Sequence, residues 1–82
     1  MSIPTIKAIR SYSYYYKVID TATVDGQPWY TVKCAPGPAN WIRQQTDKSY
    51  SWFETDAYVG NSTFDINESL YIMLCLKWPN PQ

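Results

Sequence analysis

The chain has 82 residues, 45% of them hydrophobic, and its seven Lys and Arg balance its seven Asp and Glu. This length predicts a single domain, 1–82, because a chain of this size has no room for a second core. The neutral charge argues against a DNA mimic, which should be acidic, and against a strong nonspecific nucleic-acid binder, which should be basic.

The two ends of the chain are expected to lie outside the core. Residues 1–10 lack the apolar run of a signal peptide and predict an N-terminal arm, and 79–82 predict a frayed tail. The longest apolar run, 70–76, is too short to cross a bilayer. We therefore expect a soluble, cytoplasmic protein with no membrane partner. In that compartment Cys34 and Cys75 should stay free thiols, although the sequence leaves a bridge between them open.

The first half of the chain predicts a β-hairpin. Residues 12–20 are rich in Tyr and β-branched side chains, as strands are, and 29–34 have the same character. Residues 24–28 between them contain Asp-Gly, the strongest short-range signal of a hairpin turn. The second strand is expected to end at 35–38, because two prolines and a glycine suit neither a helix interior nor a central strand.

Two segments are compatible with more than one element. Residues 39–45 suit either a short helix, with Pro38 at its first position, or a strand. The apolar run 70–78 suits either a buried strand or a helix capped by Asp65, with Glu68 three residues later. Length favours the strand for this run, since nine residues make a short helix but an ordinary strand.

A second hairpin is expected from strands at 50–59 and 62–66, joined by a Gly-Asn loop. The predicted fold class is therefore all-β: a small antiparallel meander of about five strands, or an SH3-like or OB-like barrel that protects its sheet edges. The alternative is a β-rich α+β fold with one short helix, at 39–45 or 65–77.

Residue types that many enzymes and metal sites need are missing. The chain has no His, two distant Cys and three scattered Gly, which excludes His-based catalysis and His-ligated metals and argues against a phosphate-binding loop. Glu54 and Asp56 would share one face of a strand with Cβ atoms roughly 7 Å apart, as in some glycosidases, but a solvated strand face explains them equally well. We expect no enzyme activity, no metal and no cofactor.

Aromatic residues are the remaining functional signal, with eight Tyr, four Trp and two Phe in the chain. Alternation along 12–20 places three tyrosines on one face, and three phenol hydroxyls are hard to satisfy together in a core. Tyr and Trp also supply many binding hot spots, although each Trp could instead fill a small core. The predicted binding surface consists of Tyr12, Tyr14, Tyr16, Trp29, Trp41 and Trp52.

Alternation also predicts which residues are buried. Along 29–34, Trp, Thr and Lys share one face while Tyr, Val and Cys share the other. Along 50–59, Phe53 falls on the more apolar face and Trp52 on the face that carries the charged residues. The expected core contains Ile19, Val32, Ile42, Phe53, Leu70, Ile72, Leu74 and Leu76.

Three functions fit these features. The first is a protein-binding module whose Tyr/Trp face docks on a partner or on a second copy, as in a small inhibitor, an adaptor or, by analogy of size alone, a phage or mobile-element accessory protein. The second is a carbohydrate or small-ligand binder whose rings stack on sugars. The third is a single-stranded nucleic-acid binder on an OB-like barrel, against which the neutral charge argues.

Overall fold

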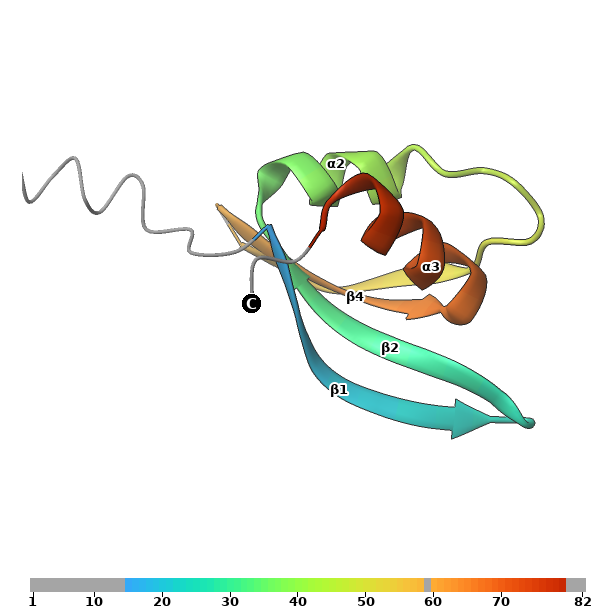
Figure 1. The fold of residues 1–82 in the computed structure, drawn as a ribbon. Helices are drawn as coiled ribbons and strands as arrows, with labels where there is room; N and C mark the ends of the chain where they lie inside the picture. Colours follow the sequence, from blue (N-terminus) through green and yellow to red (C-terminus); the bar gives the residue numbers. More distant parts are fainter. Residues whose placement is uncertain (1–14, 59, 80–82) are drawn as a thin grey trace, which may run out of the picture.

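The computed structural model describes residues 15–58 and 60–79, which form a four-stranded antiparallel sheet with two helices on one face (Figure 1). The elements in chain order are β1 (Tyr16–Val24), β2 (Gln27–Cys34), α2 (Pro36–Arg43), β3 (Trp52–Tyr58), β4 (Asn61–Asn67) and α3 (Glu68–Lys77). The strands lie in the order β1-β2-β4-β3, so β1 and β3 are the edges. The predicted β-rich class is confirmed, but the described residues form neither a barrel nor a fifth strand. The predicted arm at 1–10 lies outside the described residues.

The predicted first hairpin is confirmed. β1 and β2 pair through a turn in which Asp25 and Gly26 have φ angles of 52° and 76°. Two positive φ angles are typical of a type I′ turn, which suits the twist of a hairpin. A bulge between Val18 and Asp20 shifts the register of β1. The bulge leaves Ile19 exposed, so the prediction of Ile19 in the core is wrong.

The helical alternative is correct for the ambiguous middle segment, although the helix begins earlier than expected. α2 starts at Pro36, directly after β2, with Ala35 as its N-cap residue. Prolines fit the first turn because the first amide groups of a helix have no acceptor within it. The proline-rich stretch is therefore the first turn of a helix, and β2 ends just before it. Within α2, Pro38, Ala39 and Ile42 are buried.

The second hairpin is also confirmed, but β3 faces the opposite way from the prediction. Its partner β4 alternates between buried and partly exposed residues along its whole length. Trp52 lies opposite Ile66, which is buried, whereas Phe53 lies opposite Asp65 on the face that the helices leave uncovered. Phe53 is 63% exposed, so its predicted place in the core is wrong.

The last apolar run is a helix, so the predicted strand is wrong. β4 runs directly into α3, and the cap is Asn67, whose Oδ1 accepts a 3.2 Å hydrogen bond from the backbone N–H of Leu70. Leu70 and Leu74 lie one turn apart and are both buried. Helical periodicity leaves Ile72 and Leu76 exposed, contrary to the prediction that all four residues share a core face.

The core lies between the two helices and the sheet. Cys34 is buried and Cys75 is partly buried, and both are free thiols, as expected. No helix in the described part of the chain is long and apolar enough to span a membrane. The buried cluster consists of Tyr16, Val32, Cys34, Ala39, Ile42, Phe64, Ile66, Leu70 and Leu74.

Two groups in this core, the Cys34 thiol and the Tyr16 hydroxyl, can lose a proton at high pH. Their burial predicts that the free energy of unfolding falls in alkali. Burial raises the pKa of the Cys34 thiol to about 12 and raises the pKa of the Tyr16 hydroxyl above its usual range. An unfolded thiol loses its proton near pH 8.5 and an unfolded phenol near pH 10. Above those values the folded chain holds protons that the unfolded chain releases, so stability falls as pH rises, by up to about 1.4 kcal/mol per pH unit for each group.

Urea unfolding at a series of pH values between 7 and 11 measures this loss. Cys34→Ala and Tyr16→Phe should each flatten the alkaline decline, and the double variant should flatten it most. A free energy of unfolding that stays constant to pH 11, or a decline that both substitutions leave unchanged, would show that neither group is responsible.

Candidate binding surface

The four predicted site residues that the structure describes do not form one surface. Tyr12 and Tyr14 lie outside the described residues. Tyr16 is only 2% exposed, and its hydroxyl donates a 3.3 Å hydrogen bond to Cys75 Sγ. The prediction that Tyr16 faces a partner is therefore wrong, because a sulfur acceptor in the core satisfies the phenol that was expected to need solvent.

Two of the predicted tryptophans pack at the margin of the core instead. Trp41 on α2 meets Trp78 edge-to-face, with ring centroids 5.5 Å apart. Trp52 on β3 meets Phe64 edge-to-face at 5.8 Å, and its indole N–H donates a 3.1 Å hydrogen bond to the backbone oxygen of Gln45. Both rings are partly buried and pack against the core, which accounts for their positions, and their predicted role in binding stays a prediction.

Among the predicted residues that the structure describes, Trp29 alone lies on the uncovered face of the sheet. Its ring stacks on that of Phe53, with centroids 6.0 Å apart and planes inclined by 27°. Trp29 comes from β2 and Phe53 from β3, and β4 lies between these strands. At this level β4 presents Asp65 and Asn67, which lie opposite Phe53 and Trp29.

Carboxylates border the ring pair. Asp20, Thr31 and Asp65 lie opposite one another on β1, β2 and β4, and Phe53 completes this row on β3. The Thr31 hydroxyl donates a 2.6 Å hydrogen bond to Asp65 Oδ1. A shallow hollow of about 370 Å³ lies over this part of the sheet. We call its lining the open-face patch: Asp20, Ala22, Val24, Trp29, Thr31, Phe53 and Asp65.

The next row of the same face carries positive charge. Lys17 on β1 lies opposite Lys33 on β2. On β2, Lys33 follows Thr31 by two residues, so this pair is the next one on the same face. The charge on the uncovered face therefore changes sign over a short distance. The ammonium groups of Lys17 and Lys33 are followed by the carboxylates of Asp20 and Asp65, beside which the two rings lie.

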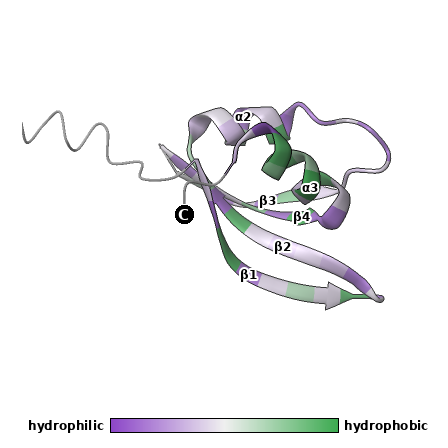
Figure 2. Cartoon of the chain, in the orientation of Figure 1, coloured by the Kyte–Doolittle hydropathy of each residue, from purple (hydrophilic) through white to green (hydrophobic). Residues whose placement is uncertain are grey.

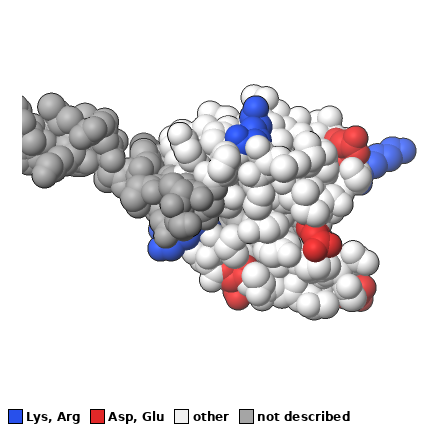
Figure 3. Space-filling model, in the orientation of Figure 1, with Lys and Arg blue, Asp and Glu red and all other residues white. Residues whose placement is uncertain are grey.

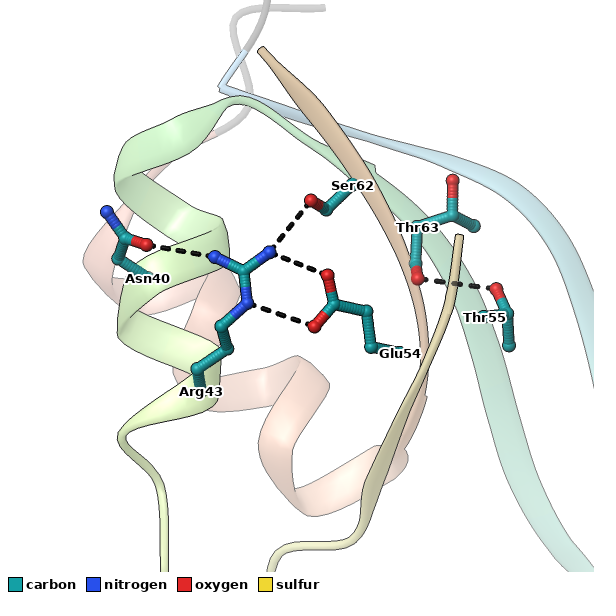
Figure 4. Close-up of polar contacts among 6 residues, drawn as sticks. All are labelled: Asn40, Arg43, Glu54, Thr55, Ser62 and Thr63. Atoms are coloured by element: carbon teal, nitrogen blue, oxygen red, sulfur yellow. Dashed lines mark hydrogen bonds and ion pairs between the residues drawn. The ribbon is translucent and has the colours of Figure 1, made fainter. Parts of the chain in front are cut away.

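A polar cluster joins the covered side of β3 to α2 (Figure 4). Arg43 on α2 donates to both carboxylate oxygens of Glu54, from Nε at 3.0 Å and from Nη2 at 2.6 Å. It also donates to Asn40 Oδ1 and Ser62 Oγ, each at 2.9 Å. The hydrogen bond from Arg43 lowers the pKa of Glu54, so the carboxylate is held in its charged form. A two-pronged ion pair of this kind favours one orientation of the strand that carries the acid.

This cluster corrects two predictions about β3. A bulge between Glu54 and Asp56 places Asp56 opposite Thr63 on the uncovered face, so the two carboxylates do not share one side of the strand. The sequence alone suggested that charged Glu54 marks the solvent side. Glu54 instead contacts Arg43 on α2, and Phe53, one residue earlier, lies on the opposite side of the strand and is exposed. No pattern in the sequence pairs these distant residues.

Elsewhere in the described part of the chain, neither a patch of one charge sign nor a cluster of metal-ligating residues stands out. Charged side chains are scattered over the face drawn in Figure 3 and do not gather into a patch of one sign. Within 15–58 and 60–79, no group of three or more His, Cys, Asp or Glu side chains is arranged to hold a metal ion. Comparison with protein-family models, curated proteins and solved structures finds no match for this chain.

Proposed function

We propose that this domain is a non-enzymatic protein-binding module and that the open-face patch meets the partner. The observation that carries the proposal is the stacked pair of Phe53 and Trp29, which lie on the sheet face opposite the buried Val32 and Ile66. Exposing more than half of a Phe side chain is unfavourable, and apolar patches with a polar border commonly mark interaction surfaces. Aromatic residues at the centre of such a patch supply much of the binding energy.

The charges around the rings indicate what the partner presents. Asp20 and Asp65 border the hollow, so a Lys or Arg beside the inserted apolar side chain would meet a carboxylate. The same carboxylates would repel phosphates, which argues against single-stranded nucleic acid as the ligand. The free thiols of Cys34 and Cys75 support a reducing, cytoplasmic setting for this interaction.

Trp29→Ala and Phe53→Ala are each expected to weaken partner binding at least tenfold, since each removes a central ring, and to change the thermal midpoint little. The assay uses immobilised short peptides with a central Leu or Trp flanked by Lys, beside matched peptides in which Glu replaces Lys. The wild-type chain should prefer the Lys-flanked set. Leu76→Ala, on the helical side of the domain, is the matched control and should bind as the wild type does.

Two results would contradict this function. One is wild-type binding that Trp29→Ala and Phe53→Ala both leave intact, because the ring pair would then not be the contact surface. The other is equal binding of the Lys-flanked and Glu-flanked peptides, which would remove the role assigned to Asp20 and Asp65. Loss of binding accompanied by an equal loss of folded protein would likewise count against it.

One observation favours carbohydrate as a second candidate ligand. Thr31 and Asp65 form a hydroxyl–carboxylate pair beside the Trp29 ring, and sugars are held by stacking on a ring together with hydrogen bonds at their hydroxyls. The aliphatic lining from Ala22 and Val24 suits a protein side chain better. Titration of a glycan panel against tryptophan fluorescence separates the two, and a shift that Asp65→Asn abolishes would favour the sugar.

A further inference from the structure

The open-face patch contains two carboxylates for which the described part of the chain supplies no ion-pair partner. Asp20 and Asp65 lie in one row of the sheet, on either side of Thr31. One oxygen of each accepts a hydrogen bond, from the backbone N–H of Thr21 in the case of Asp20 and from the Thr31 hydroxyl in the case of Asp65. The second oxygen of each carboxylate can therefore accept a hydrogen bond from a ligand.

The bulge in β1 places Asp20 on this face. Strict alternation along the strand would put Asp20 on the same side as Val18, which packs against the core. The extra residue, Ile19, shifts the register, so Asp20 pairs with Thr31 and lies in one row with Asp65. Bulges commonly redirect a side chain next to a functional site. The two carboxylates therefore share a row because of an irregularity that the pairing of the hairpin does not itself require.

The Trp29 ring is a flat apolar surface beside these carboxylates. Phe53 stacks on it with centroids 6.0 Å apart. A third flat group does not fit between the two rings, because two stacking contacts of about 3.5 Å each would need about 7 Å. Across the sheet from Trp29, β1 carries only Ala22, whose small side chain leaves room on that side. The hollow extends there over Ala22 and Asp20, and Figure 2 shows hydrophobic segments along β1 with more polar ones between them.

We propose that this hollow receives an arginine side chain of the partner protein, whose guanidinium stacks on the Trp29 ring and donates to Asp20 and Asp65. The inference rests on the proposed function and names the side chain that the open-face patch selects. Charge complementarity favours this occupant, because a cation there neutralises two carboxylates at once. An apolar side chain next to the arginine in the partner would lie on Phe53, which is more than half exposed.

The spacing of the carboxylates favours arginine over lysine. Asp20 and Asp65 are two strands apart, and since neighbouring strands lie about 4.8 Å apart, their Cα atoms are separated by about 10 Å. A guanidinium carries several N–H donors on a planar fork and can donate to both sides, whereas an ammonium is a point charge. The guanidinium is also flat and weakly hydrated, so it stacks well on an indole ring. Arginine therefore contacts Trp29 and both carboxylates together.

Fluorescence anisotropy of labelled peptides with a central Leu tests the proposal. The peptides are identical except that Arg, Lys or citrulline, the neutral analogue of Arg, flanks the Leu. The wild-type chain should bind the Arg peptide about fivefold more tightly than the Lys peptide, and the citrulline peptide more weakly than either. Asp20→Asn and Asp65→Asn should each remove this preference, as should Ala22→Leu, which fills the hollow beside Trp29. Asp56→Asn, the same change on the same face but outside the hollow, is the matched control and should bind as the wild type does.

Equal affinity for the Arg and Lys peptides would overturn this inference but not the protein-binding function, which requires only that cationic peptides bind better than Glu peptides. An Arg preference that survives in both Asp20→Asn and Asp65→Asn would also overturn it, because the arginine would then bind elsewhere. Absence of binding to every peptide would remove the proposed function, and this inference with it. The comparison of the three peptides uses the wild-type chain, so it does not depend on how well any variant folds.

Discussion

Phe64→Ala is expected to lower the free energy of unfolding by about 3–5 kcal/mol, the range for truncating a buried aromatic side chain. Phe64 is fully buried in the middle of β4. The ring of Trp52 meets it edge-to-face, and the Arg43 guanidinium lies over its ring at 5.5 Å from the centroid. Truncation would leave a cavity where a strand, a helix and the β3 edge meet, and these rigid elements cannot collapse into it.

This loss is large compared with the total free energy of unfolding of the domain. A chain of 82 residues has a total stability of about 4–12 kcal/mol, so Phe64→Ala should leave a substantially unfolded population. Phe53→Ala is the matched control, because it makes the same chemical change on the exposed face and should alter the free energy of unfolding by about 1 kcal/mol or less. Urea unfolding followed by circular dichroism measures both. Similar losses in the two variants would contradict the assignment of inner and outer faces on β3 and β4.

Leu74→Ala is the second large effect, expected to cost about 2–5 kcal/mol, whereas Leu76→Ala should be close to neutral. The two residues are of one type and lie two positions apart on α3, but Leu74 is fully buried against the sheet and Leu76 is mostly exposed. Removing Leu74 takes away one of the two leucines that hold α3 on the sheet, the other being Leu70.

The comparison of Leu74→Ala with Leu76→Ala also tests the secondary structure of this segment. In a strand both leucines would point to one face, and both truncations would cost about the same. In a helix they lie about 200° apart around the axis, so only one truncation is costly. Chemical denaturation of the two variants, with far-ultraviolet circular dichroism to report helix content, distinguishes these cases. Equal destabilisation would contradict the helix.

Local chemistry was sufficient where neighbouring residues determine the backbone by themselves. Asp25 and Gly26 accept the positive φ angles of a tight hairpin turn, and that hairpin is confirmed. The alternation along 29–34 is confirmed as well, with Val32 and Cys34 buried and Trp29 on the opposite face. In these segments adjacent residues determine the backbone conformation, so it can be predicted without knowing any distant contact.

Local chemistry failed where burial depends on a partner far along the chain. Alternation in β3 correctly separated Trp52 from Phe53, but nothing nearby showed which of them the helices cover. The contact of Arg43 with Glu54 joins residues that are eleven positions apart, and it supports the unexpected choice. Tyr16 was likewise assigned to a partner because the acceptor of its hydroxyl, Cys75, lies at the other end of the described chain.

By itself, the sequence determined the two hairpins, the antiparallel β-rich character and the place of Trp29 on the face opposite Val32 and Cys34. The tertiary structure decided that the last apolar run is a helix, that Phe53 lies beside Trp29 in the open-face patch while Tyr16 is buried, and that α3 leaves Ile72 and Leu76 exposed. The physical reason is that the periodicity of apolar residues, two in a strand or 3.6 in a helix, shows which residues share a face but not which face is buried. That choice follows from packing between elements, and only the folded chain brings those elements together.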